Sequence, residues 1–217
     1  ELALDAFNAG DYYRAVEDEV VSETVTKILY PNDEPAAGKQ LRLLQQYFFV
    51  SCSLQDILHL IEDLAGSHVR SLPDRVAVQL NDTHPSIAVA ELMRLLMDER
   101  HLGWDESWRI TVATMGYTNH TLLPEALETW PLSMFEQFLP RHLEIIFEIN
   151  RRFLDEVRAS FPGDEARVRR MSIIGEDGSK SVRMAHLATV GSHAVNGVAA
   201  MHSELVKTTI LKDFYEM

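Results

Sequence analysis

One segment of the sequence, residues 75–98, limits the folds open to this chain more than any other. Residues 75–80 are rich in apolar and β-branched side chains and are bounded by Pro73 and Asn81, so we expect a buried strand there. A polar turn follows, and apolar residues at helical spacing then predict a helix over residues 86–98. A strand that leads through a turn into a helix is the repeating unit of α/β proteins, so the predicted fold class is α/β.

Helical periodicity dominates the rest of the chain. Helices are predicted over residues 10–29, from Gly38 to Leu64, over 143–161 and over 185–211. The last of these is rich in small residues and is expected to be a closely packed interior segment. Residues 171–174 and 181–184 flank a turn that contains glycine, which predicts a β-hairpin. Residues 108–114 fit a strand or a helix, because β-branched side chains favour the first and the preceding acidic residues suit the second.

Length and charge narrow the class of protein. The chain has 217 residues, enough for one sizeable domain or two small ones. Its 33 acidic and 20 basic residues give a formal net charge of -13, which argues against a nucleic acid or an anionic membrane as partner. No apolar stretch is long enough to span a membrane. The chain begins at Glu1 without an initiator Met and ends at Met217 beside an apolar segment, so we expect a fragment of a longer protein.

Cysteine usage bears on the compartment. Cys52 is the only cysteine, so an internal disulfide is excluded. It lies in the apolar run 48–52, which predicts a buried and inert thiol. This composition fits a reducing compartment, and a cytoplasmic location is expected.

The polar turn after the predicted strand is the first candidate site. It carries Asp82 and His84, and ligands of α/β proteins bind at the carboxyl ends of strands. Carboxylate and imidazole groups can hydrogen-bond sugar hydroxyls. The alternative is that Thr83 or Ser86 caps the helix while Asp82 compensates its dipole. On this motif alone, capping is the favoured interpretation.

A second polar segment, Asn119-His120-Thr121, lies between aromatic and apolar residues. It is either a sugar-binding loop or a buried turn whose side chains satisfy local backbone groups, and the residues favour neither. Glu125 and Glu128 lie three apart, as paired carboxylates of glycoside hydrolysis could, but acids at a helix start are the favoured interpretation.

Other chemistries lack their motifs. The nine histidines form no metal-binding spacing, and the single cysteine rules out a cysteine pair, so no metal is expected. The sequence also contains no glycine-rich phosphate loop and no Gly-x-Ser-x-Gly nucleophile motif.

Several short motifs occur in one order along nearly the whole chain. They are Leu29-Tyr30-Pro31-Asn32-Asp33, Leu80-Asn81-Asp82-Thr83-His84-Pro85, Tyr117-Thr118-Asn119-His120-Thr121, Leu123-Pro124-Glu125-Ala126-Leu127-Glu128, Leu139-Pro140-Arg141-His142-Leu143, Phe161-Pro162-Gly163-Asp164 and Ser192-His193-Ala194-Val195-Asn196-Gly197. Together they resemble the α-glucan (glycogen, starch, maltodextrin) phosphorylases, with a bacterial-type pattern.

The resemblance implies a hexosyltransferase of the two-domain GT-B type. Such an enzyme releases glucose 1-phosphate from α-1,4-glucan ends with inorganic phosphate and uses pyridoxal phosphate as cofactor. Residues 1–217 match a single fragment, the helix-rich latter part of the Rossmann-like N-terminal domain. The C-terminal domain that holds the cofactor lysine and binds phosphate is not matched. The resemblance therefore implies no catalytic or cofactor-binding residue in this fragment, and no activity of the fragment alone.

The resemblance also implies which residues face the sugar. His120 matches a residue that contacts the 6-hydroxyl of the transferred glucose, largely through its backbone carbonyl. Asp82, His84 and Glu125 match residues that line the path of the remaining glucan, and Asp33 lies in the loop that gates this path.

Several departures qualify the match. Glu34 stands at a gate position that is Asn in the animal enzymes, so animal-type gating is not expected. His59-Leu60 replaces an arginine pair that binds the phosphate of AMP there, and the loop from Gly66 to Pro73 is shorter than in the animal enzymes, so no AMP activation is expected. A secondary glucan site is matched only in part. Asn150, Glu176 and Lys180 agree with it, whereas Phe147, Glu144 and Arg151 replace a Tyr and two Gln.

Quaternary structure and two rival interpretations complete the predictions. Residues 10–24 match the element that pairs across the family's homodimer interface. One rival is a non-catalytic carbohydrate-binding or interaction module that reuses this half-domain, and the other is a free-standing α/β domain whose likeness is only structural.

Overall fold

The protein was analysed as a computed structural model, which describes residues 3–64, 68–123, 127–176 and 178–217. The chain divides into two compact units, residues 1–49 and 50–217, and each is considered by itself. Within the described residues, no helix combines the length and apolar character needed to cross a lipid bilayer.

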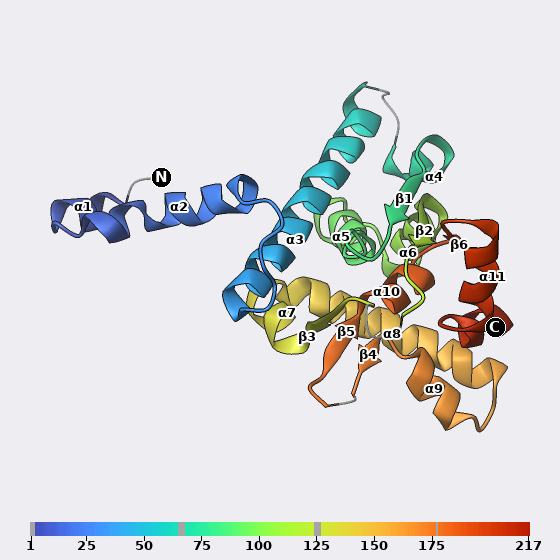
Figure 1. Ribbon diagram of the computed structural model, residues 1–217. Helices are drawn as coiled ribbons and strands as arrows, with labels where there is room; N and C mark the ends of the chain where they lie inside the picture. The colour runs from blue at the N-terminus through green and yellow to red at the C-terminus, as the bar shows by residue number, and fades with distance from the viewer. Residues whose placement is uncertain (1–2, 65–67, 124–126, 177) are drawn as a thin grey trace. The chain divides into compact units, whose positions relative to one another are not determined.

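The first unit is helical (Figure 1). It contains α1 (Leu4–Asn8), α2 (Tyr12–Lys27) and the first part of α3 (Ala36–His59), which confirms the helix predicted over residues 10–29. The Asp11 carboxylate caps α2 by accepting a hydrogen bond from the Arg14 backbone N–H at 3.2 Å. Ala15 is buried in this unit, whereas Tyr13 is 92% exposed and Val20 is 55% exposed. Several apolar side chains of α2, among them Tyr13 and Val20, therefore form an exposed surface.

The loop before α3 makes a close approach that requires glycine. A Cβ atom on Gly38 would lie 1.7 Å from the backbone oxygen of Asn32. The helix was predicted to follow Gly38, but it begins at Ala36, so Gly38 lies in its first turn. Beyond His59 the helix continues as the π-helical turn η1 (Leu60–Leu64), which agrees with the predicted end at Leu64.

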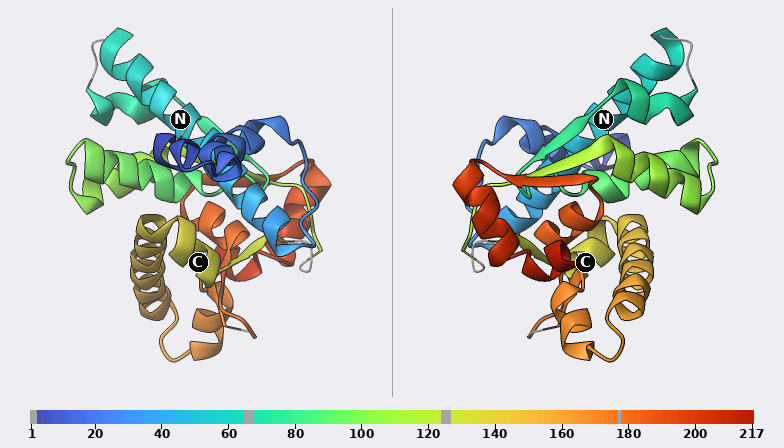
Figure 2. Two further views of the ribbon diagram at one scale, coloured as in Figure 1. Left: turned by 90° about the vertical axis from the view of Figure 1, so that its left-hand side faces the viewer. Right: turned by 90° about the vertical axis from the view of Figure 1, so that its right-hand side faces the viewer.

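The second unit is built on a small parallel sheet, which confirms the α/β prediction (Figure 1). Its strands are β1 (Val78–Asn81), β2 (Met115–Asn119) and β6 (Ala194–Gly197), in the order β1-β2-β6. Both pairings are parallel, and the right-hand view of Figure 2 shows the three strands side by side. The sheet is packed against α6 (Trp104–Thr114), α10 (Met184–Val190) and α11 (Ala200–Thr208).

The predicted strand–turn–helix segment is confirmed. Strand β1 occupies the second half of the expected strand, and the helix forms as α5 (Ala88–Arg94), which continues into the π-helical turn η3 (Leu95–Glu99). Between α3 and β1 lie the 3-10 turn η2 (Val69–Ser71) and the short α4 (Leu72–Arg75).

Two predictions of secondary structure need correction or resolution. The ambiguous segment 108–114 is the end of helix α6, and strand β2 begins at the next residue. The single helix predicted over residues 185–211 is wrong, since α10 and α11 are separated by strand β6. Small residues do not by themselves decide between helix and strand. Residues 194–197 adopt the strand conformation because they pair with β2, which lies almost 80 residues earlier in the sequence.

A second sheet and its helices complete this unit. Strands β3 (Thr129–Pro131), β4 (Ile174–Gly175) and β5 (Ser181–Arg183) form an antiparallel sheet, which confirms the predicted hairpin. The adjoining helices are α7 (Leu132–Phe138), α8 (Pro140–Ser160), α9 (Glu165–Met171) and α12 (Lys212–Glu216). Helix α8 confirms the prediction over 143–161 and packs Phe153 and Val157 against α9 and Phe214.

Cys52 differs from its prediction. Its side chain is exposed on α3, although the neighbouring Ser51 and Leu54 are buried. The apolar run 48–52 suggested burial on every face, but a helix turns successive residues in different directions, so only part of the run can face the core.

Close packing between α10 and α5 makes the first testable prediction. A Cβ atom on Gly191, which follows α10, would lie 2.5 Å from both methyl carbons of the buried Val89. Gly191→Ala is expected to lower the free energy of unfolding by about 1–3 kcal/mol, because the well-packed core must shift to admit a methyl group. Gly103→Ala is the control, since a Cβ there meets nothing within 4 Å. Equal denaturation midpoints for the two variants would contradict the prediction.

Candidate functional site

The parallel sheet brings the two predicted polar segments together. Asn81 pairs with Thr118 in the β1–β2 register, so both strands end at one edge of the sheet. Beyond the last pair, the Asp82 backbone N–H donates to the Thr118 carbonyl oxygen at 2.9 Å. Across the same edge, the His120 Nε2 contacts the Asn81 side-chain oxygen. Asp82 and His120 therefore lie at adjoining strand ends, where ligands of α/β proteins bind.

Asp82 has an unusual backbone conformation. Its φ is 69°, in the left-handed region that Asp and Asn tolerate better than most residues. One carboxylate oxygen accepts a hydrogen bond from the Thr83 backbone N–H at 2.7 Å. The other forms no hydrogen bond or ion pair with the described residues, and the side chain is only partly buried. The carboxylate thus keeps lone pairs that can accept hydrogen bonds from a ligand.

The helix-capping alternative does not hold for this turn. Helix α5 begins at Ala88 and has no side-chain capping hydrogen bond. The Ser86 hydroxyl is buried without a hydrogen-bond partner in the described residues, and Ser86 donates its backbone N–H to the Thr83 carbonyl at 3.0 Å. Neither Thr83 nor Ser86 is a cap, so capping does not account for the polar turn. His84 lies in this turn and is exposed.

The segment around His120 is not a turn that satisfies only its own backbone. Asn119 is fully buried at the end of β2, and its amide bonds the side chains of Tyr117 and His202. Burial raises the pKa of Tyr117 to about 12, an effect that the hydrogen bond from Asn119 opposes and the charge of Asp82 adds to. His120 follows Asn119 and is exposed to solvent as a residue.

The face of the sheet opposite to the Tyr117 and Asn119 side chains carries a row of polar side chains that the sequence did not predict. Gln79 donates to the Thr118 hydroxyl at 2.8 Å, and that hydroxyl donates to the Asn196 side-chain oxygen at 3.3 Å. Gly116 leaves room for this row, because its Cβ would lie 2.7 Å from the Gln79 oxygen. The alternation of Gly116 and Thr118 with the large apolar side chains of Met115 and Tyr117 is a usable signal, but it requires recognising β2 as a strand.

The remaining residues predicted for the glucan path are Glu125 and Asp33. Glu125 lies outside the described residues. Asp33 belongs to the first unit, where its exposed carboxylate pairs with Arg42 at 3.0 Å. In the same loop, the Glu34 backbone N–H donates to the Asn32 side-chain oxygen at 3.1 Å.

The predicted secondary site is brought together around one cavity. Asn150 on α8 and Glu176 and Lys180 on the β4–β5 turn line a hollow of about 790 Å³, together with Phe147. Lys180 lies 3.6 Å from Glu176, which makes a loose ion pair. The Asn150 oxygen accepts the Ile173 backbone N–H at 2.7 Å, so this side chain also anchors the hairpin.

Three further positions refine that site. Arg169 lines the cavity, and its guanidinium has no partner among the described residues, which the sequence interpretation missed. Arg151 pairs with Glu148 at 2.7 Å and Glu144 pairs with Arg141 at 2.9 Å, so both are engaged on α8 itself.

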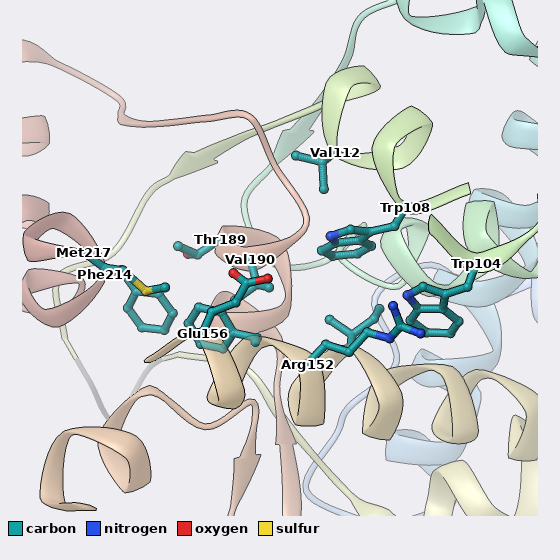
Figure 3. A pocket seen from close by; sticks show the side chains of 11 residues that line it. Trp104, Trp108, Val112, Arg152, Glu156, Thr189, Val190, Phe214 and Met217 are labelled. Atoms are coloured by element: carbon teal, nitrogen blue, oxygen red, sulfur yellow. The ribbon is translucent and has the colours of Figure 1, made fainter. Parts of the chain in front are cut away.

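A separate cavity of about 350 Å³ is lined by aromatic residues (Figure 3). Trp104 and Trp108 from α6 face Phe214 and Glu156 across it. Arg152 lies over the Trp104 ring at 4.9 Å and also pairs with Asp105 and Glu148. None of the predicted site residues that the structure describes lines this cavity.

One strongly perturbed carboxylate, that of Glu91, lies away from these surfaces. Glu91 is fully buried, and burial raises the pKa of its carboxyl group. Hydrogen bonds from Arg94, His142 and Ser51 outweigh this effect and lower the pKa to about 2. Through these bonds Glu91 joins α5, α8 and α3. Because no solvent reaches its carboxylate, Glu91 is not available to a ligand.

The described residues do not fit a pyridoxal phosphate site. All five lysines of the chain are described, and each lies at the surface. Lys27, Lys180, Lys207 and Lys212 are paired with neighbouring glutamates. A Schiff-base lysine needs a desolvated setting, and none of these five lysines is buried. Within the same residues, no three His, Cys, Asp or Glu side chains gather as metal ligands do.

Comparison with known proteins identifies the family of this α/β chain. The family model described as "Carbohydrate phosphorylase" matches residues 1–217. The chain belongs to the carbohydrate phosphorylase family.

Individual relatives support the same membership. The chain is 65% identical over 213 residues to a glycogen phosphorylase of Synechocystis sp., which covers 97% of this chain and 25% of that protein. It is 53% identical over 224 residues to the human brain form and to the rabbit muscle form of glycogen phosphorylase, covering 100% of this chain and 27% of each relative. The chain thus spans about a quarter of the length of the curated relatives it matches.

Proposed function

We propose that this chain is a segment of a glycogen or α-glucan phosphorylase and supplies the glucan-facing side of its cleft. The observation that carries the proposal is the adjoining position of Asp82 and His120 at the ends of β1 and β2, in a chain of the carbohydrate phosphorylase family. The whole enzyme, a GT-B hexosyltransferase in which residues 1–217 form the latter part of the N-terminal domain, would release glucose 1-phosphate from α-1,4-glucan ends with inorganic phosphate in the cytoplasm.

The chemistry of the strand edge suits a neutral polyol. Asp82 offers a carboxylate acceptor, His84 an exposed imidazole and His120 a carbonyl and a ring, and each can bond a sugar hydroxyl. In this proposal, Glu125 and the gate-loop residue Asp33 extend the glucan path.

Bond cleavage is assigned to the rest of the enzyme. Pyridoxal phosphate, which supplies a phosphate for proton transfer, would be held by a lysine outside this chain, because the surface lysines here do not fit it. The chain carries a net charge of -13, which disfavours binding of the anionic substrate phosphate. Residues 1–217 alone are therefore expected to release no glucose 1-phosphate from maltodextrin and phosphate, and turnover above background would refute this assignment.

The central test is Asp82→Ala in the full-length enzyme. Loss of a charged hydrogen-bond acceptor is expected to raise the KM for maltodextrin by about tenfold or more, since such a bond contributes about 1.5–3 kcal/mol. Cofactor occupancy, measured by pyridoxal phosphate absorbance, is expected to stay unchanged because the cofactor site lies elsewhere.

Asp74→Ala serves as the matched control for that test. Asp74 is an exposed carboxylate on α4, ahead of strand β1, and has no partner among the described residues. If Asp82→Ala and Asp74→Ala leave the glucan kinetics equally unchanged, Asp82 has no role in glucan binding.

The cavity beside α8 supports a second glucan anchor. Asn150, Glu176 and Lys180 line it, and Arg169 adds a cation without a partner in the described residues. Its volume of about 790 Å³ lies in the range of ligand pockets. The Phe147 ring replaces the Tyr of the animal enzymes there and can still pack against a sugar face.

Assembly and regulation are proposed from the helical segments. The exposed apolar side chains of α2, among them Tyr13 and Val20, support homodimer pairing through residues 10–24. AMP activation is not expected. His59 Nδ1 lies 2.8 Å from the Asp63 carboxylate, and this acidic neighbour disfavours a nucleotide phosphate.

A further inference from the structure

The buried side of the β2 carboxyl end contains a hydrogen-bonded group of three side chains. Asn119 Nδ2 donates to the Tyr117 hydroxyl at 3.0 Å, and Asn119 Oδ1 contacts His202 Nε2 at 2.9 Å. An amide oxygen only accepts, so His202 Nε2 carries the proton and donates. Asn119 and Tyr117 are fully buried and cannot hydrogen-bond water, so these bonds are what satisfies their polar atoms.

The chain makes room for this contact at one glycine. His202 lies on α11, and its ring crosses the last residue of β6, Gly197, to reach β2. A Cβ atom on Gly197 would lie 2.3 Å from His202 Cδ2. The Gly197 backbone N–H donates to the Ser203 hydroxyl at 2.9 Å, which ties the start of α11 to the same strand end.

His120 is therefore held from two directions. Its backbone follows directly from Asn119, whose side chain is bonded to α11. Its ring contacts Asn81 at the end of β1. Under the proposed function, on which this inference rests, the His120 carbonyl meets the transferred glucose, so a small shift of this strand end would move a substrate contact.

We propose that His202, Asn119 and Asn81 are positioning residues that fix the His120 carbonyl for the sugar. None of the three needs to touch the glucan. His202 and Asn119 set the position of the β2 backbone, and Asn81 restrains the ring. Displacement of a contact by about 1 Å can cost about 100-fold in rate, so loss of such a restraint is measurable.

The test is made in the full-length enzyme with maltodextrin and inorganic phosphate. His202→Ala removes the donor and leaves the Asn119 oxygen buried without a partner. We expect kcat/KM for the glucan to fall by about tenfold or more, with most of the loss in kcat, because the misplaced carbonyl loses a contact that matters in the transition state. His202→Gln keeps an N–H donor and is expected to retain most of the activity. If His202 only filled space, the presence of a donor in the variant would make no difference.

Two further variants keep the proposal falsifiable. His193→Ala removes an exposed histidine from the loop before β6 and is expected to leave kcat/KM unchanged. Asn81→Ala changes an exposed residue, so it is expected to fold, and it is expected to lower kcat/KM by several fold. Thermal unfolding of each variant shows whether a loss of activity comes from unfolding or from displacement of the His120 carbonyl in a folded enzyme.

The outcomes distinguish this inference from the proposed function. If Asp82→Ala raises KM but folded His202→Ala and Asn81→Ala both match His193→Ala, the positioning role is wrong and the glucan site stands. If Asp82→Ala also has no effect, the proposed function itself fails. Equal losses in His202→Ala and His202→Gln would likewise overturn the role of the hydrogen bond.

Discussion

Replacing Glu91 with glutamine is expected to lower the free energy of unfolding by about 3–5 kcal/mol, the cost of removing one partner from a buried ion pair. Arg94 approaches the Glu91 carboxylate with two nitrogens, at 2.8 and 2.9 Å. His142 Nε2 and the Ser51 hydroxyl each lie 2.6 Å from its oxygens. The neutral amide cannot balance the guanidinium charge, and it cannot accept all of these bonds.

Chemical denaturation of Glu91→Gln beside Glu99→Gln checks this expectation. Glu99 also contacts Arg94, at 2.9 Å, but its side chain is 41% exposed. An exposed pair of this kind contributes about 0–1 kcal/mol, so Glu99→Gln is expected to unfold almost as the parent does. Similar losses in both variants would show that burial does not set the strength of the Glu91 cluster.

Lowering the pH from about 6.5 to about 4 is expected to reduce the free energy of unfolding by about 3 kcal/mol through His186 alone. Burial lowers the pKa of His186 to about 4 in spite of the opposing hydrogen bond to Ser172, and the nearby charge of Arg183 is a smaller contribution in the same direction as burial. The Nδ1 atom lies 2.9 Å from the Ser172 carbonyl oxygen, and the ring packs edge-on against Phe214 at 4.9 Å.

The sign follows from which state binds the proton. Below pH 6.5 the unfolded chain protonates His186 while the folded chain keeps it neutral, so acid favours unfolding. This contribution is complete above the unfolded pKa and is lost as the pH falls through the folded value. The Glu91 contribution is lost at lower pH, as the pH falls through its folded pKa of about 2, so the two groups act in different windows.

Unfolding of His186→Gln and His193→Gln between pH 4.5 and 7 measures this contribution. His186→Gln is expected to flatten the pH dependence, because glutamine does not titrate and can still donate to Ser172. The exposed His193 is the matched control, and its substitution is expected to keep the slope. An unchanged slope in His186→Gln would assign the acid sensitivity to other groups.

Local patterns were sufficient where an element makes its own periodic contacts. Helix α8 and the β1–turn–α5 segment were predicted from spacing, since each buries one regular face. Strands β2 and β6 were missed because their stability depends on partners about 40 to 80 residues away, which no local window contains. Cys52 was misplaced for a related reason, because apolar character alone does not tell which side of a helix faces the core.

The sequence by itself determined the α/β class, the family motifs and the presence of Asp82, His84 and His120 as polar groups where an apolar run stops. Tertiary structure alone decided their arrangement. Parallel register sets the ends of β1 and β2 side by side, and α5 begins too late in the chain for Thr83 or Ser86 to cap it. The contact of His202 with Asn119 over Gly197 joins residues 83 positions apart, and only the packing of α11 against the sheet could create it.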